Sequence, residues 1–483
     1  MSYLAGIDIG SSNIKVAIFE EDGTMIAKQA VTNTLHFPRK GWSEYDPDEV
    51  WENTVACLSR CVQSLGAGAT VQGVSISSMG EVGIPINNNG SPLYPAISWM
   101  DKRTLPQMNW WLQNLGREHI FSISGMPLDP MYSMHRIMWL REHYPEIYYS
   151  MYKWICLPDY IVFKLTGEFM TSYSIASRTM AFDVHKKAWS VELCETANIA
   201  PTIFPDVTLS GVVAGGVSAK ASKITGLQPG TPVVLGGHDH ACVAVALGLS
   251  QSDEIVDSTG TGEGIVAVSD SSRLPEVLLA TNRYACYPHC VPNKYLVLGH
   301  LGVVGKTLEW ISDLTGRSLE EYRCDPELPM YFPFLGSNDD TIQDSGGWIG
   351  ITPLCTKDDL VNSMMESSCF WFRQNLELYT SGFEVQPRTI WLTGGLSQCE
   401  ILTRLKADVL NCPITIPRYP ELALLGAAMI AGVGTGVYAS WQEAFHRIHL
   451  PLDRVVPTED TIHIYQERYK RYVKTALALK NIG

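Results

Sequence analysis

Asp239 lies in the stretch of the sequence that most clearly combines residues able to do chemistry. It follows the apolar run 231–235, which predicts a buried strand, and it precedes the apolar run 241–249, which predicts a helix. A carboxylate at the end of a strand can point into a cleft and accept a proton, or it can cap the helix that follows. The local pattern leaves both roles open.

A second chemical feature follows within the next thirty residues. Residues 257–262 read Asp-Ser-Thr-Gly-Thr-Gly and lie between the apolar segments 255–256 and 265–268, which predicts a strand, a turn and a second strand. Turns rich in glycine and hydroxyl groups expose backbone N–H groups that bind anions. A candidate base beside a phosphate-binding turn indicates phosphoryl transfer, in which the protein mainly orients the nucleophile and stabilises charge.

The N-terminus follows the same plan. Residues 4–9 predict a strand that carries Asp8 near its end, and the turn Gly10-Ser11-Ser12-Asn13 leads into a predicted strand at 14–19. Asp8 and Asp257 lie about half a chain apart, which predicts an internal duplication. Two such hairpins in a shared cleft would hold one nucleotide between them. Taken alone, the first turn is also typical of an ordinary hairpin.

Composition excludes several classes of protein. A chain of 483 residues predicts two large domains or three smaller ones, and 46% hydrophobic with 18% charged residues is typical of a globular protein. A net charge of −14 argues against nucleic acid or an anionic membrane as the main partner. No signal peptide or membrane-length apolar run is visible, so we expect a cytoplasmic protein. The twelve cysteines lack zinc-site spacing and are expected to be buried, reduced thiols.

The elements that must position these groups are predicted from apolar periodicity and from the places of glycine and proline. Further strands are expected at 24–30, 71–76 and 390–393, and a hydroxyl-rich loop at 171–179. Asp46 and Pro47 mark the start of the first helix. Helices are expected at 46–62, 126–143, 156–165, 301–313, 358–379, 397–410, 421–436 and 465–479.

Trp99, Asp101 and Arg103 bring an aromatic ring and charges of both signs together. The ring could cover the C–H face of a hydroxylated ligand while the charged groups bind its hydroxyls. The same composition also describes a surface ion pair beside a core tryptophan.

Three stretches resemble the FGGY family of carbohydrate kinases. Residues 131–143, MYSMHRIMWLREH, are similar to the first family signature, except that Arg136 stands where the pattern has Lys. Residues 346–351, GGWIGI, followed by 359–366, fit the second signature throughout. The N-terminal hairpin, residues 236–239 and residues 393–395 also match in family order. The resemblance therefore spans nearly the whole chain.

The resemblance implies an α/β fold with two ribonuclease H-like (actin-like ATPase) domains and a catalytic cleft between them. It implies a sugar- and phosphate-binding domain at 1–246, a nucleotide-binding domain at 247–440 and a helical extension at 441–483. The implied cofactors are ATP and Mg²⁺, with Asp8 holding the metal through water molecules. The implied partners are a small sugar or polyol and ATP, and a homodimer is left open.

The resemblance also implies a role for each candidate site residue. Asp239 becomes the general base that accepts a proton from the attacking sugar hydroxyl. The implied nucleotide-binding residues are Ser11, Ser12, Lys15, Gly260, Thr261, Gly305, Glu309, Gly394 and Gly395. The implied substrate-binding residues are Ser78, Met79, Trp99, Asp101 and His240.

Two departures from the family limit the expected substrate. Glycerol kinases have an Arg-Glu pair where this chain has Ser78-Met79, which disfavours glycerol, and xylulokinases have Met-His there. The Gly-Glu-Arg segment of the family reads Gly336-Ser337-Asn338 here. A ketopentose, a related sugar or a polyol is therefore expected. Two other classes stay open: a degenerate kinase that only binds and regulates, and an actin-like ATPase without a sugar pocket.

Overall fold

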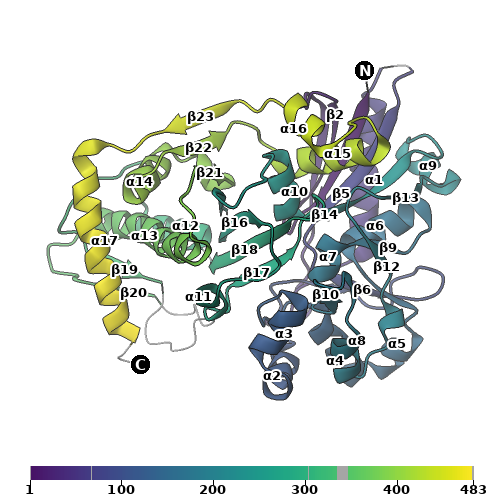
Figure 1. Cartoon of the computed structure of the whole chain (residues 1–483), viewed down its shortest axis with the longest axis horizontal. Helices are drawn as coiled ribbons and strands as arrows, with labels where there is room; N and C mark the ends of the chain where they lie inside the picture. Colours follow the sequence, from purple (N-terminus) through teal and green to yellow (C-terminus); the bar gives the residue numbers. More distant parts are fainter. Residues whose placement is uncertain (1, 67, 261, 303, 334–345, 481–483) are drawn as a thin grey trace.

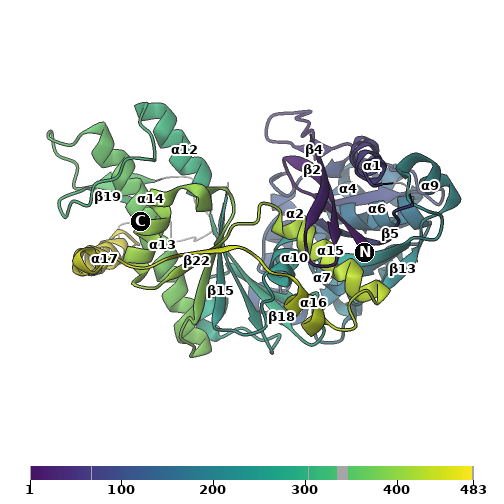
Figure 2. The same ribbon diagram turned by 90° about the horizontal axis from the view of Figure 1, so that it is seen from above.

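The structure is a computed structural model that describes residues 2–66, 68–260, 262–302, 304–333 and 346–480. Two α/β domains lie side by side, each built around one large sheet (Figure 1). Seen from above, the two sheets occupy opposite halves of the molecule (Figure 2). This arrangement matches the two-domain α/β architecture that the sequence predicts.

The first sheet consists of β13 (Val213–Gly216), β14 (Pro232–His238), β5 (Val71–Ser78), β1 (Tyr3–Ile9), β2 (Asn13–Glu20) and β3 (Met25–Thr32), in that order. Because β1, β5 and β14 run parallel, their carboxyl ends meet at one edge of the sheet. The register places Asp8 opposite Ser77, and Ser78 opposite both Ile9 and His238. Three neighbouring strands therefore bring Asp8, Ser78 and the segment before Asp239 together.

Helices cover both faces of the first sheet. One face packs against α1 (Pro47–Gln63), α6 (Leu157–Thr166) and α9 (Ala219–Thr225), and the other against α10 (Asp239–Ala246) and α15 (Leu422–Thr435). The predicted start of α1 is confirmed, because the Asp46 side chain accepts hydrogen bonds from the N–H groups of Asp48 and Glu49 and Pro47 opens the helix.

The second sheet repeats the hairpin and the parallel strands of the first. It consists of β17 (Tyr284–Pro288), β18 (Tyr295–Gly302), β16 (Glu263–Ser269), β15 (Glu254–Thr259), β21 (Thr389–Thr393), β22 (Ile414–Pro417) and β23 (Leu452–Val455), in that order. β15 pairs antiparallel with β16 and parallel with β21, as β1 does with β2 and β5. The helices around this sheet are α12 (Val304–Thr315), α13 (Lys357–Phe383), α14 (Glu400–Leu410) and α17 (Glu459–Lys480).

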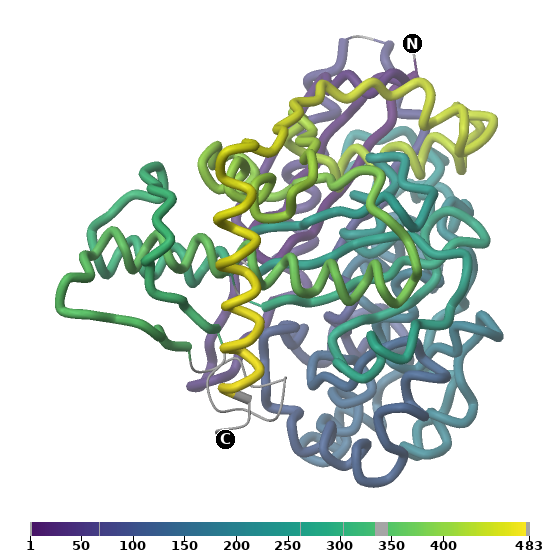
Figure 3. Tube along the Cα trace, turned by 60° about the vertical axis from the view of Figure 1, so that its left-hand side comes forward, coloured from purple at the N-terminus to yellow at the C-terminus, as the bar shows by residue number. Residues whose placement is uncertain are grey.

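The last part of the chain crosses between the domains. α15 and α16 (Trp441–Arg447) lie on the first domain, whereas β23 and α17 lie on the second (Figures 1 and 2). In Figure 3, α17 (yellow) runs across the helices of the second domain, and its tyrosines share a core with α13 and α14. α15 falls within the expected second-domain range 247–440, yet it packs on the first sheet. α15 approaches β1 and α10 closely because two glycines leave room for it. A Cβ at Gly6 on β1 would overlap the carbonyl oxygen of Leu424 on α15, and a Cβ at Gly426 on α15 would overlap the carbonyl oxygen of Cys242 on α10.

Several element boundaries differ from the sequence predictions. The helix expected at 126–143 begins only at Ser133 (α4, Ser133–His143), because Pro127 and Pro130 remove two backbone donors from the preceding segment. The loop expected at 171–179 contains β9 (Met170–Ser172) and α7 (Tyr173–Ser177), since the Ser172 hydroxyl caps a short helix. The helices expected at 301–313 and 397–410 begin at Val304 and Glu400, because the preceding segments form the end of β18 and a 3₁₀ turn at Gly395–Gln398.

Asp257 lies inside β15 and not in the turn that follows it. All twelve cysteines fall within the described residues, and all are free thiols; eight are buried and four are half-buried. None of the helices described here is both long enough and apolar enough to cross a membrane.

Candidate active site

The carboxyl edge of the first sheet carries two acidic side chains, Asp8 and Asp239, that interact electrostatically. The Ser77 hydroxyl donates a hydrogen bond of 2.9 Å to Asp8 Oδ1. Burial and, next, the charge of Asp239 raise the pKa of Asp8 to about 7, while Ser77 and Lys15 oppose this rise. Asp8 and Asp239 therefore form a site of concentrated negative charge that favours a cation.

Asp239 is the first residue of α10, and its side chain is 40% exposed. His238 occupies the N-cap position and forms no side-chain cap, so Asp239 is not the capping residue of this helix. Asp239 Oδ1 accepts a hydrogen bond of 2.6 Å from the N–H of His240. The partial positive charge of the helix N-terminus also stabilises the carboxylate. The side chain is thus held locally and still reaches solvent.

The paired glycines before Asp239 allow β14 to approach its neighbours closely. A Cβ at Gly236 would overlap the carbonyl oxygen of Ile76 on β5, and a Cβ at Gly237 would overlap Cys290 Sγ. These contacts hold the end of β14 against the sheet, which explains why small residues precede the acidic one.

A buried polar network next to Asp239 was not predicted from the sequence. Arg178 Nε donates to Glu81 Oε1 at 2.6 Å, and the Arg178 Nη2 group makes a second contact with the same oxygen. His238 Nε2 lies 3.6 Å from Glu81 Oε1, and its Nδ1 lies 3.0 Å from the hydroxyl of Tyr287. Burial opposes the charged form of Glu81, but Arg178 and His238 together hold the pKa of Glu81 well below its usual value. The sequence holds only two signals for this network: Glu81 closely follows β5, and His238 directly precedes the candidate base.

Two of the predicted substrate-binding residues, Ser78 and Asp101, use their polar atoms for hydrogen bonds within the protein. The Ser78 hydroxyl donates to the carbonyl of Ile9 at 3.0 Å. Asp101 is almost fully buried and accepts from the N–H of Ser43 and from the backbone and guanidinium of Arg103, four bonds in all. A carboxylate has about four acceptor positions, so little capacity is left for a sugar hydroxyl.

The Asp101–Arg103 pair is an ion pair, as the alternative interpretation had it, but it is buried and does not lie at the surface. The tryptophan beside it is the half-buried Trp42, whose ring centroid lies 3.7 Å from the guanidinium carbon of Arg103. Trp99 itself is half-buried and packs on the core of the first domain.

The other two predicted substrate-binding residues lie at the same edge as Asp239. Met79 is 5% exposed and follows directly on β5. His240 is half-buried, with its ring centroid 5.4 Å from that of His238. Burial lowers the pKa of His240 although Asp239 opposes the shift, so the ring is neutral near pH 7.

Glycines bring the predicted nucleotide-binding segments of the second domain together. A Cβ at Gly305, at the start of α12, would overlap the carbonyl oxygen of Gly260 in the β15–β16 turn. Gly394 has a φ of +91°, and a Cβ there would overlap the carbonyl oxygen of Thr259. Gly395 has open space around it. Three chain segments thus converge on one place because none of them carries a side chain at the contact.

The remaining predicted nucleotide-binding residues lie on exposed or half-exposed positions. Glu309 is exposed on α12, Ser12 is exposed and Ser11 is half-exposed in the first hairpin turn. Lys15 Nζ forms an ion pair of 2.9 Å with Glu421, which also binds Lys28 at 3.0 Å. Thr261 and residues 336–338 lie outside the described residues.

His300 lies beside the glycine turn of the second domain. It lies on β18 of the second domain, and a Cβ on Gly262, at the end of the β15–β16 turn, would come within 3.6 Å of its ring. His300 itself is exposed. α10, whose first residue is Asp239, contacts β16, the strand that follows the glycine turn of the second domain.

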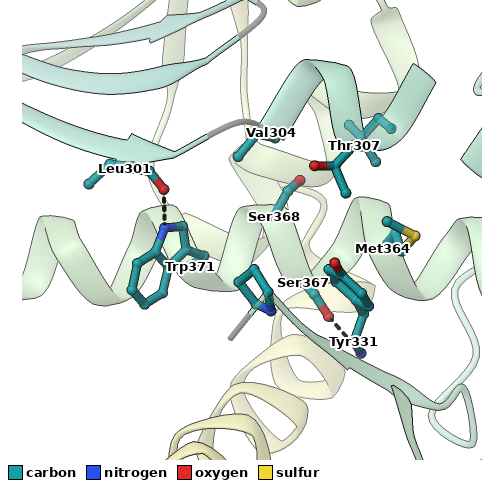
Figure 4. A pocket seen from close by; sticks show the side chains of 10 residues that line it. Leu301, Val304, Thr307, Tyr331, Met364, Ser367, Ser368 and Trp371 are labelled. Atoms are coloured by element: carbon teal, nitrogen blue, oxygen red, sulfur yellow. Dashed lines mark hydrogen bonds between the residues drawn. The ribbon is translucent and has the colours of Figure 1, made fainter. Parts of the chain in front are cut away.

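A separate cavity of about 80 Å³ lies in the second domain between α12, α13 and β19 (Met330–Phe332) (Figure 4). Its polar groups are partly used within the protein: Trp371 Nε1 donates to the carbonyl of Leu301 at 2.7 Å, and the Ser367 hydroxyl accepts from the N–H of Tyr331 at 3.1 Å. None of the predicted nucleotide-binding residues that the structure describes lines it. The lining residues are Leu301, Val304, Thr307, Leu308, Tyr331, Pro333, Met364, Ser367, Ser368 and Trp371.

Comparison with known proteins agrees with this geometry. Residues 3–246 match the N-terminal domain of the FGGY family of carbohydrate kinases, and residues 256–435 match the C-terminal domain. A xylulose kinase of Staphylococcus xylosus is 26% identical over 487 residues, which cover 98% of this chain and 99% of that protein. An L-xylulose/3-keto-L-gulonate kinase of Escherichia coli (strain K12) is 25% identical over 489 residues, covering 99% of this chain and 97% of that protein.

The fold is likewise shared with a solved structure. The crystal structure of a xylulose kinase from Rhodospirillum rubrum superposes with a TM-score of 0.90 at 21% identity and covers 99% of both chains. The fold and the family matches together define a two-domain α/β carbohydrate kinase. The chain belongs to the FGGY family of carbohydrate kinases and is an ATP-dependent carbohydrate kinase.

Proposed function

We propose that this kinase transfers the terminal phosphoryl group of ATP to a hydroxyl of a ketopentose or a closely related sugar, with Asp239 as the general base. The observation that carries the proposal is the place of Asp239. It lies at the carboxyl edge of the first sheet and is partly exposed, and its helix contacts β16, the strand that follows the glycine turn of the second domain. A base in this position can reach a hydroxyl that faces the phosphate-binding turn.

The chain's own residues account for most of the expected chemistry. Asp239 orients the attacking hydroxyl and accepts its proton late in the transfer, because the transition state is largely dissociative. The turn at Gly260 and the loop at Gly394 and Gly395 would bind the phosphates through backbone N–H groups, and the open space around Gly260 and Gly395 would allow a close approach. Closure of the two domains would exclude water, which otherwise competes with the sugar as acceptor.

Asp8 fits the expected role of a magnesium-binding residue. No three His, Cys, Asp or Glu side chains of the described chain are grouped to hold a metal ion. Mg²⁺ does not require such a group, because it keeps several waters and is usually bound through one or two carboxylates and the substrate phosphates. The repulsion between Asp8 and Asp239 would be relieved by a cation. Bound Mg²⁺ would neutralise phosphate charge, and Asp8 would be its protein ligand, through water.

Among the described residues, the arginine of the network next to the base has no free positive charge, which supports a neutral substrate. Arg178 lies behind His238, but its guanidinium is paired with Glu81. Binding of a phosphate or carboxylate group usually uses an unpaired arginine. We therefore expect a substrate with several adjacent hydroxyls and no anionic group of its own.

Release of ADP in the presence of pentuloses, hexuloses, tetritols and pentitols tests the proposed substrate class. We expect turnover with a pentulose such as xylulose and little ADP release without sugar. Turnover only with sugar phosphates or sugar acids would contradict the substrate proposal. Sugar-independent ADP release would indicate an ATPase, and sugar and nucleotide binding without turnover would indicate a degenerate, regulatory protein.

Asp239→Asn tests the base, because it keeps the size of the side chain and removes its basic oxygen. We expect a folded protein that binds ATP and sugar within a few-fold of the wild type, and a kcat lower by about 10²–10⁴. Asp358→Asn is the matched control, since Asp358 is also a half-exposed carboxylate in the first turn of a helix but lies on α13. Normal turnover in folded Asp239→Asn would remove Asp239 as the base.

A further inference from the structure

His238 is the buried residue that connects Asp239 to the polar network behind it. Its side chain is 5% exposed, and it directly precedes the base in the sequence. His238 Nδ1 lies 3.0 Å from the Tyr287 hydroxyl and 3.3 Å from Asp239 Oδ1. On the other edge of the ring, Nε2 lies 3.6 Å from Glu81 Oε1. One imidazole thus contacts the base on one edge and an anchored carboxylate on the other.

The groups around this ring are fixed independently of Asp239. The N–H of His238 donates to the Ser174 hydroxyl at 3.1 Å, which holds the backbone. Glu81 is held by Arg178. Tyr287 comes from β17 of the second sheet, and the neighbouring Cys286 N–H donates to the carbonyl of Gly125 in the first domain at 2.8 Å. The ring therefore has a rigid frame that includes both domains.

The contacts of the Asp239 carboxylate are asymmetric. Within the described part of the chain, its two close contacts, with the N–H of His240 and with His238 Nδ1, are both made by Oδ1. This leaves Oδ2 available for the sugar hydroxyl. A carboxylate only accepts hydrogen bonds, so the contact with His238 requires a proton on Nδ1. The hydroxyl oxygen of Tyr287 can accept from the same N–H. It therefore favours the ring orientation in which the Nδ1 proton lies between the Tyr287 oxygen and Asp239 Oδ1.

We propose that His238 is a positioning residue for the general base: through its Nδ1–H it holds Asp239 Oδ1, so that Oδ2 faces the substrate hydroxyl, and Tyr287 holds the ring in that orientation. The inference rests on the proposed role of Asp239. A neighbouring hydrogen bond can set the orientation of a general base. Loss of the hydrogen-bond partner then lowers the rate and leaves substrate binding largely intact.

Two substitutions test the proposal at different atoms. Tyr287→Phe removes one hydroxyl and keeps the ring. His238→Gln places an amide near the Nε2 position, whereas His238→Asn keeps a donor near the Nδ1 position. With xylulose, or the pentulose of highest turnover, we expect Tyr287→Phe and His238→Gln to lower kcat about 10–100-fold with KM for sugar and ATP changed less than about threefold. His238→Asn should retain most of the wild-type kcat.

A double-mutant cycle separates positioning from a merely structural role. If His238 acts through Asp239, His238→Gln should cost little further activity in an Asp239→Asn background, because the group that it positions is already lost. Additive losses would overturn the proposal. Tyr284→Phe is the control for Tyr287→Phe, since Tyr284 is a buried tyrosine of the same strand whose hydroxyl donates to the carbonyl of Asn375; we expect it to leave kcat unchanged.

The outcomes also distinguish this inference from the proposed function. Low turnover in Asp239→Asn together with normal kcat in both Tyr287→Phe and His238→Gln would overturn the positioning role and leave the base in place. Normal turnover in Asp239→Asn would overturn both. Thermal stability is measured on each variant, and if His238→Gln does not fold, Tyr287→Phe decides the question because it deletes only one oxygen atom.

Discussion

Replacing Lys406 with methionine would remove the cation that joins two buried carboxylates in the second domain. Lys406 lies on α14, and its ammonium group contacts Asp257 on β15 and Glu263 on β16, the second at 2.5 Å. All three side chains are at most 1% exposed. The ammonium also lies 4.9 Å from the ring centroid of Phe372. Methionine has a similar length, so the main change is the loss of charge.

The expected loss of stability follows from burial. Removing one partner of a buried ion pair typically costs about 3–5 kcal/mol, because the other charge stays buried without compensation. Burial already raises the pKa of Asp257 to about 7 although Lys406 opposes the shift. Without Lys406 this pKa rises further, and a protonated Asp257 carries no uncompensated charge. The loss should therefore be about 3–5 kcal/mol at pH 8 and smaller at pH 5.

Urea unfolding followed by circular dichroism measures this loss. The triple variant Lys406→Met/Asp257→Asn/Glu263→Gln removes all three charges and should recover part of the stability. Lys470→Met is the control, because Lys470 pairs with Glu467 at 2.7 Å with both side chains more than 70% exposed, and such pairs contribute about 0–1 kcal/mol. A loss for Lys406→Met as small as for Lys470→Met, or a larger loss at pH 5 than at pH 8, would refute the reasoning.

Two further substitutions test the nucleotide site and the pH dependence of stability. Gly305→Ala should force α12 away from the Gly260 turn, raise KM for ATP at least about tenfold and lower the free energy of unfolding by about 1–3 kcal/mol. Gly66→Ala is the control, because Gly66 has open space around it and its substitution should change neither quantity. An unchanged KM in Gly305→Ala would show that the close contact is not needed. Burial raises the pKa of Asp159 from 3.8 to about 7, so the folded state keeps this proton and the group's stabilising contribution is lost as pH rises from about 4 to 7. Asp159→Asn should therefore gain stability relative to the wild type over that range, by at most about 1.4 kcal/mol per pH unit, and a constant difference would contradict this.

The elements that the sequence predicted well are those whose signals are local. The two hairpins were found because an apolar strand, a turn of glycine and hydroxyl residues and a second strand follow one another directly. The start of α1 was found because Asp46 and Pro47 act on their immediate neighbours. The errors at 126–132 and at 171–179 are also local, since prolines and a serine cap outweighed the apolar pattern there.

The candidate site was only partly predictable for a different reason. Asp8, Asp239 and the glycines at 260, 394 and 395 could be selected because each lies near a strand end or in a turn, whereas Gly305, on a helix, was selected only through the family resemblance. The partners of other candidates could not. Asp101 is saturated by Ser43 and Arg103, and Lys15 is paired with a residue more than 400 positions away in the chain. Neither long-range pairing can be inferred from the local sequence, because Ser43 and Glu421 lie far from these residues in the chain.

The sequence by itself determined the family, the duplicated hairpins and the acidic residues at the ends of β1 and β14, because strand periodicity and turn chemistry depend on neighbouring residues. Only the tertiary structure decided that α15 packs on the first sheet, that Lys406 joins two strands of the second, and that Tyr287 of the second domain reaches His238 of the first. These contacts arise when distant segments exclude water from a common core. The stability of a buried charge or hydrogen bond there depends on all partners being brought together at once.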